Sequence, residues 1–146
     1  MLKERHFEVL QHMRRDARKP FTRISADTGI PVTTIFDYYR KFLKEKIITK
    51  QVSLLDYGLL GYHFNSVFVL TSFNFDSIVE FLESETHVNN IFKVGDNQLL
   101  FEGVFEELEE KHKFLKALDG QGLTEIHEFK VIEDIQREGF MPFIQE

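Results

Sequence analysis

The feature that most constrains the fold is a Gly-Ile-Pro turn, residues 29–31, between two short segments with helical periodicity. Gly29 suits the end of a helix, where the backbone often becomes left-handed. Pro31 suits the first turn of the next helix, where its missing N–H group is not needed. The sequence therefore predicts a short helix over Thr22–Thr28 and a longer one from Pro31 to about Lys46. Two helices joined by a tight turn are typical of a helix-turn-helix motif.

The segments around this pair complete a small domain. Apolar residues spaced three apart at Phe7, Leu10 and Met13 predict an amphipathic first helix over residues 2–15. The stretch "IITKQVSLL", residues 47–55, is rich in β-branched residues and predicts a strand, the wing of a winged helix. In the third helix, the predicted core-facing residues are Ile35, Tyr39 and Phe42, extended by Leu43 and Ile47.

The second half alternates strand and helix patterns. Strands are predicted over residues 63–73, 88–94, 99–105 and 126–132. Helices are predicted over 74–85 and 106–118, the latter packing through Leu108, Leu115 and Leu118. The order β-α-β-β-α-β is that of a ferredoxin-like domain. The predicted fold is therefore α+β, with a winged helix-turn-helix over 1–53, a hinge over 54–63 and a ferredoxin-like domain over 64–146.

The first strand of that domain is apolar almost continuously from Val67 to Leu70. Such a run is typical of a strand buried on both faces. The two helices cover one face of the sheet, so the other face needs a different cover. A second copy of the chain would supply it, which predicts a homodimer.

Charge divides between the halves of the chain. Residues 1–50 hold twelve Lys/Arg and six Asp/Glu, whereas the remaining residues hold six and eighteen. A basic half is suited to contact phosphate. The chain has no cysteine, which excludes disulfides and thiolate metal sites. Because no signal peptide and no apolar run of about 20 residues is found, we expect a cytoplasmic protein without a membrane partner.

Several of these stretches resemble the Lrp/AsnC (leucine-responsive, feast/famine) transcription regulators, particularly the archaeal ones. The resemblance rests on "RDARKPFTRISADTGIPVTTIFDYYRKFLKEKIITK" for the DNA-binding half and "LDYGLLGYHF" for the hinge. The βαββαβ half resembles the family's dimerisation and effector domain. The resemblance implies a regulator that binds double-stranded DNA as a homodimer, or as a tetramer or octamer built from it. It also implies an amino acid or another small molecule as effector.

The third helix carries the candidate DNA contacts. Hydroxyl and free N–H groups in its first turn, at Thr33 and Thr34, suit phosphate. Arg40 suits a guanine or a phosphate, and Asp37 suits a cytosine amino group or an ion pair with Arg40 or Lys41. The full candidate set is Arg23, Thr33, Thr34, Phe36, Asp37, Arg40, Lys41, Lys44 and Lys50. The alternative is a solvated basic helix face.

The chain departs from the family pattern at three places. Asp37 and Tyr38 stand where a basic pair is frequent, and Lys46 stands where a glycine usually precedes the wing. Gln98 stands where the family commonly has a carboxylate. That residue belongs to the hairpin "KVGDNQLL", which in the family helps to line the effector pocket. The resemblance thus implies Gly95, Asp96, Asn97 and Gln98 as effector-binding candidates, whereas the residues alone indicate only a tight turn.

Two alternatives remain from other classes. Some proteins of this architecture are tetrapyrrole decarboxylases of the haem pathway, which would need clusters of histidine and arginine in the second half. Arg137 is the only arginine there, so we expect no enzyme, no cofactor and no catalytic residue. The second alternative is an interaction module without DNA binding. Glu109 and His112, three apart, provide at most half a metal site, and none is expected.

Overall fold

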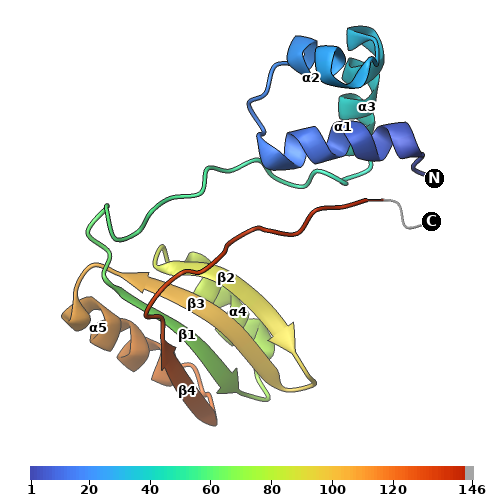
Figure 1. The fold of residues 1–146 in the computed structure, drawn as a ribbon. Helices are drawn as coiled ribbons and strands as arrows, with labels where there is room; N and C mark the ends of the chain where they lie inside the picture. Colours follow the sequence, from blue (N-terminus) through green and yellow to red (C-terminus); the bar gives the residue numbers. More distant parts are fainter. Residues whose placement is uncertain (144–146) are drawn as a thin grey trace. The chain divides into compact units, whose positions relative to one another are not determined.

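The computed structural model describes residues 1–143, which form five helices and four strands (Figure 1). Packing divides the chain into two compact units. The first unit consists of Met1–Leu54 together with the segment that begins at Gln136, and the second is Leu55–Ile135. Sequence patterning assigns the segment after 135 to the second domain, whereas in the structure it packs with the first.

Three helices form the first unit: α1 (Glu4–Arg15), α2 (Phe21–Thr28) and α3 (Val32–Lys44). Their apolar faces meet in one core that excludes water, which contributes most of the stability of such a small unit. Its buried members are Val9, Met13, Ile24, Ile30, Ile35 and Phe42. The predicted helix-turn-helix is therefore confirmed. Tyr39 and Ile47 pack at the edge of this core as expected, but Leu43 is 44% exposed and Tyr38 packs in its place.

The end of α3 is closed by a residue in an unusual conformation. Lys46 has φ 56°, in the left-handed region that favours glycine. Ile47 N–H donates to the Phe42 carbonyl at 2.8 Å and Lys46 N–H donates to the Leu43 carbonyl at 3.2 Å. These two bonds define a Schellman motif, and the contact of Ile47 with the core accompanies it. Lys46 thus occupies the position for which the family pattern has glycine.

The predicted wing strand is not formed. Residues 49–56 belong to no helix or strand and are exposed. A strand is stabilised by hydrogen bonds to a neighbouring strand, and within residues 1–143 the first unit offers no such neighbour. The β-branched composition of the segment favours a strand, but composition alone cannot supply a partner.

The second unit is a four-stranded antiparallel sheet in the order β2-β3-β1-β4, with two helices on one face (Figure 1). Its elements are β1 (Phe64–Thr71), α4 (Phe75–Ser84), β2 (Val88–Val94), β3 (Gln98–Phe105), α5 (Leu108–Asp119) and β4 (Glu125–Lys130). The predicted β-α-β-β-α-β order is confirmed. Buried aromatic residues fill the space between sheet and helices, and Phe68 stacks on Phe101 with ring centroids 4.9 Å apart.

The two faces of β1 have different surroundings. Phe68 and Leu70 point to the helices and are fully buried, whereas Val67 and Val69 on the opposite face are half-buried. Phe129 on β4 pairs with Val67, and Phe92 on β2 pairs with Leu100. Phe129 is 60% exposed and Phe92 54%. Among the described residues no helix covers this face, so it is an open and largely apolar surface in the single chain, with Glu102 and His127 beside the two valines.

Helix α5 packs through a different stripe from the predicted one. Leu118 is buried and Leu115 partly buried as expected, but Leu108, the first residue of the helix, is 42% exposed. Phe114 and the charged Lys111 are the other buried residues of this helix. Lys111 is tolerated because its Nζ lies 2.6 Å from Glu128 Oε1, which also accepts a hydrogen bond from Ser66 at 2.8 Å. Burial works to raise the pKa of Glu128, but the hydrogen bonds from Lys111 and Ser66 outweigh it and lower that pKa.

Candidate nucleic-acid interface

The Gly29 turn positions the start of α3. Gly29 adopts a left-handed conformation (φ 73°, ψ 6°), and its N–H group donates to the Ser25 carbonyl at 2.9 Å. The Thr28 hydroxyl donates to the Ile24 carbonyl and accepts from Ile30 N–H, which holds the turn closed. Ile30 is buried and anchors the turn in the core. The first N–H groups of α3 have no partner within the helix and are free to face an anion.

Helix α3 has one buried and one exposed side. Ile35 and Phe42 are fully buried. Spacings of three and four place the exposed residues on a single stripe, which we call the α3 stripe. It consists of Thr33, Phe36, Asp37, Arg40 and Lys44. Thr34 and Lys41 are half-buried beside it, so the structure brings the predicted α3 residues onto adjoining surfaces of one helix.

An aromatic contact orients the basic residue in the middle of the stripe. The Arg40 guanidinium lies 5.8 Å from the centre of the Phe36 ring, within the range of a cation–π interaction. The Phe36 ring in turn meets Phe21 of α2 edge to face, with centroids 4.9 Å apart. Arg40 is thereby held without an acidic partner among residues 1–143. Its five N–H donors are available for a carboxylate, a phosphate or a base edge.

Asp37 does not neutralise the stripe. Lys41 Nζ lies 3.9 Å from Glu45, and within residues 1–143 no ion pair joins Asp37 to Arg40 or Lys41. The predicted alternative of an intrahelical pair is therefore not seen. The exposed Asp37 carboxylate could accept a hydrogen bond from an external donor.

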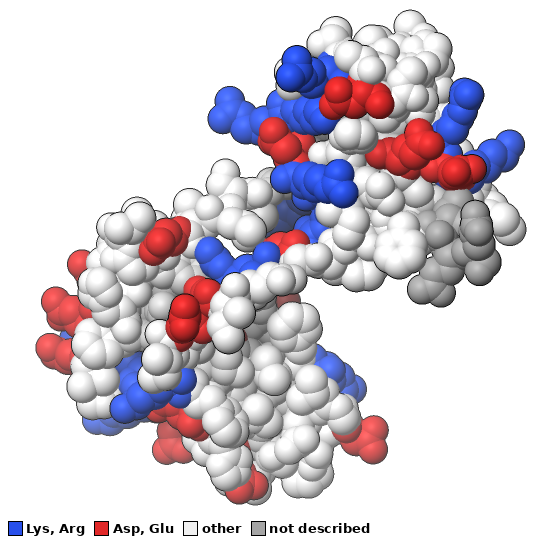
Figure 2. Space-filling model, viewed as in Figure 1, with Lys and Arg blue, Asp and Glu red and all other residues white. Residues whose placement is uncertain are grey.

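Three other basic residues of the first unit differ in their surroundings. Arg23 on α2 and Lys50 after α3 are exposed, as a phosphate contact requires. Lys19, by contrast, is tied to Asp27 at 2.6 Å and to His12 Nδ1 at 2.8 Å, and its hydrogen bond lowers the pKa of Asp27. Figure 2 shows Lys and Arg side chains spread over the visible surface of this unit, with carboxylates between them.

The hairpin between β2 and β3 is compact. Its turn covers Gly95–Asn97, with Gly95 at φ 65°, and Gln98 is already paired in the sheet with Val94 and Thr71. The Asn97 carbonyl accepts a hydrogen bond from Ser72 N–H at 3.0 Å. Asp96 and Gln98 are exposed. Gln98 is therefore a strand residue rather than a turn residue, and the Asp96 carboxylate is the accessible charge of the hairpin.

A cavity of about 320 Å³ lies elsewhere in the second unit, between the hinge and the start of β2. Tyr57, Tyr62, His87 and Asn89 contribute polar groups to its wall. None of the four hairpin candidates lines it. Across residues 1–143 no three His, Asp or Glu side chains come together as a metal site, and none of the helices could cross a bilayer.

No protein-family model and no curated protein matches the sequence. Solved structures do match. A transcriptional regulator from Neisseria meningitidis, in complex with L-Met, superposes with a TM-score of 0.85 at 13% identity, over 97% of both chains. AsnC from E. coli gives 0.81 at 15%, over 97% of this chain and 99% of that one.

An AsnC family transcriptional regulator from Agrobacterium tumefaciens gives 0.82 at 17% identity, over 97% of both chains. The coverage extends through both units in each comparison. At these identities the likeness concerns the fold. This chain therefore has the fold of these transcriptional regulators, a helix-turn-helix unit followed by a βαββαβ unit.

Proposed function

We propose that this chain is a DNA-binding transcription regulator of the Lrp/AsnC type. It acts in the cytoplasm as a dimer or higher oligomer on pseudo-palindromic sites. The observation that carries the proposal is the α3 stripe, an exposed polar and basic surface on a helix whose other side is anchored in a core. Its fold neighbours are named as transcriptional regulators, which favours this function over a tetrapyrrole decarboxylase.

In this function α3 enters the major groove. Thr33, Thr34 and the N–H groups of the first turn bind a phosphate, which sets the register on the duplex. Arg40 contacts a base edge, with guanine as its best bidentate acceptor, and Asp37 accepts from a cytosine amino group. Phe36 supports Arg40 and can also meet a thymine methyl group. Outside these contacts, phosphate binding is assigned to Arg23, Lys41, Lys44 and Lys50.

The test begins with DNA selected by the purified protein from a random pool. Arg40→Ala should weaken binding to the selected DNA by about 1–3 kcal/mol and leave binding to random DNA nearly unchanged. Arg5→Ala is the matched control, since it removes the same charge from an exposed position on α1, outside the stripe. No enrichment of any sequence, or equal losses for the two variants, would refute base recognition through Arg40.

The same proposal gives the open face of the sheet a partner. Val67, Val69, Leu100 and the exposed rings of Phe92 and Phe129 form an apolar surface that a second copy of the chain would bury. A dimer also matches a two-fold symmetric operator, since each protomer places one α3 in one half-site. Sedimentation of the purified chain at micromolar concentration tests the dimer directly.

An amino acid effector is assigned to the hairpin Gly95–Gln98. The exposed Asp96 carboxylate suits an ammonium group, and N–H groups of the turn suit a carboxylate. Gln98 contributes no charge, so it supports the ammonium side weakly. A fold neighbour was solved with L-Met, which gives the first compound to test.

A further inference from the structure

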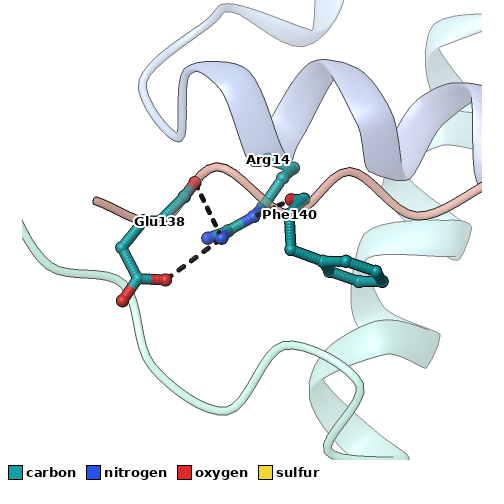
Figure 3. A network of polar contacts seen from close by, with 3 residues as sticks. All are labelled: Arg14, Glu138 and Phe140. Atoms are coloured by element: carbon teal, nitrogen blue, oxygen red, sulfur yellow. Dashed lines mark hydrogen bonds and ion pairs between the residues drawn. The ribbon is translucent and has the colours of Figure 1, made fainter. Parts of the chain in front are cut away.

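Residues 136–143 form a segment without helix or strand that lies on α1 (Figure 3). Arg14 Nε donates to the Phe140 carbonyl at 2.9 Å. Arg14 Nη2 donates to the Glu138 carbonyl at 2.9 Å and to the Glu138 carboxylate at 3.1 Å. One turn earlier on the same face of α1, Gln11 Nε2 donates to the Pro142 carbonyl at 3.0 Å.

The spacing of these contacts shows how the segment is held. The three carbonyls belong to residues 138, 140 and 142, so the contacts recur at every second residue of the segment. Gln11 and Arg14 are three residues apart, so a single face of α1 meets a single edge of the segment. The phenylalanine rings of the segment contribute little to its contact with α1, since Phe140 is 75% exposed and Phe143 is also exposed. Recognition is thus polar and directed at the main chain.

The backbone at the start of the segment carries strain that needs compensation. Glu138 has φ 52°, a left-handed conformation that is unfavourable for a residue with a side chain. Both its carbonyl and its carboxylate are bound by the same guanidinium. The guanidinium of arginine holds its N–H donors in a fixed planar fork, whereas the lysine ammonium is a compact charge on a flexible stem. The contact with Arg14 therefore offsets the strained conformation at Glu138.

We propose that residues 136–143 are a strap that docks on α1 of the same chain, with Gln11 and Arg14 as its binding surface. Arg14 consequently serves the strap and not the DNA backbone. The covalent chain passes between the two units twice, before Leu55 and after Ile135, so the strap gives the first unit a second tether. This last step rests on the proposed function: the second tether restricts the motion of the first unit, which favours binding of two half-sites at once.

The absence of cysteine makes a direct test simple. Phe140→Cys in the full chain carries a nitroxide label, and it preserves the docking contact because that contact uses the carbonyl and not the ring. The label should be more mobile with Arg14→Gln than in this protein, and its mobility should be unchanged with the matched control Arg15→Gln. Circular dichroism verifies that each variant is folded. Equal label mobility in this protein and in Arg14→Gln overturns the strap.

A photoactivatable benzophenone on the same cysteine identifies which chain is bound. A cross-linked product of monomer mass supports docking within the chain, whereas a product of dimer mass overturns that assignment in favour of exchange between copies. These measurements use no DNA, so they stand even if the proposed function fails.

DNA binding supplies the last comparison. Arg14→Gln should lower affinity for paired half-sites on the order of tenfold and leave affinity for a single half-site unchanged. Equal losses on both, with no change in label mobility, would identify Arg14 as a phosphate contact and overturn the proposal.

Discussion

Replacing Lys46 by glycine should stabilise the first unit. Lys46 closes α3 at φ 56°, and a left-handed backbone costs a residue with a side chain roughly 1–2 kcal/mol. Glycine removes that cost but loses more freedom on folding, by roughly 0.5–1 kcal/mol. The two hydrogen bonds that close the helix are made by main-chain N–H groups of Lys46 and Ile47, so the substitution preserves them. The difference leaves a net gain of about 0.5–1 kcal/mol for Lys46→Gly.

Amide hydrogen exchange is the suitable assay, because it reports on the first unit separately from the second. Protection of the buried Ile35 and Phe42 amides should increase about two- to fivefold in Lys46→Gly, as the free energy above implies. Lys46→Ala is the matched control, since it removes the same charged side chain but retains the left-handed cost. If the alanine variant gained as much protection as the glycine variant, the stabilisation would come from charge and the backbone argument would be refuted.

Four other predictions concern the core, the sheet and the hairpin. Burial lowers the pKa of His6, and the charges of Lys41 and Lys3 add to this effect. The contribution of His6 to stability is therefore present above its ordinary pKa of 6.5 and is lost as pH falls through the lowered pKa. His6→Gln should flatten a plot of melting temperature against pH between pH 7 and 5. Lys111→Met should lower the free energy of unfolding, measured in urea, by about 1–3 kcal/mol. This loss is smaller than for a fully buried ion pair because Glu128 is partly exposed. Adding Glu128→Gln should recover most of the lost free energy. Val69→Asp, on the open face of the sheet, should convert a dimer into a monomer in sedimentation, whereas an unchanged mass would exclude that face. L-Met should raise the melting temperature of the parent and not of Asp96→Ala, and a response shared by both would place the ligand elsewhere.

Much of the fold can be predicted from periodic patterns. Apolar residues three and four apart identify α1 and α3 because a helix core selects exactly those positions by burial. The alternation of strand and helix patterns gives the order of the second unit, since each element is long enough to show its period. The α3 stripe also follows from the sequence, because the positions opposite Ile35 and Phe42 must face away from the core.

Three features of the structure differ from what the sequence predicts, each for a physical reason. The wing strand was predicted from β-branched residues after α3, but a strand depends on a partner that composition does not indicate. Lys111 is buried because Glu128, seventeen residues away, neutralises it, and no local pattern signals such a pairing. The docking of residues 136–143 uses main-chain carbonyls, which every residue possesses, so only Arg14 and Gln11 could have hinted at it.

The two-part composition of the first unit has a consequence for its synthesis. Its helices occupy residues 4–44, and its remaining part follows the whole of the second unit in the chain. Domains begin to fold as they leave the ribosome, N-terminal elements first. The three helices can therefore collapse early, while the face of α1 that carries Arg14 stays open until the βαββαβ unit has been made. A nascent chain stalled before residue 136 would display a formed helix-turn-helix whose α1 face is still vacant.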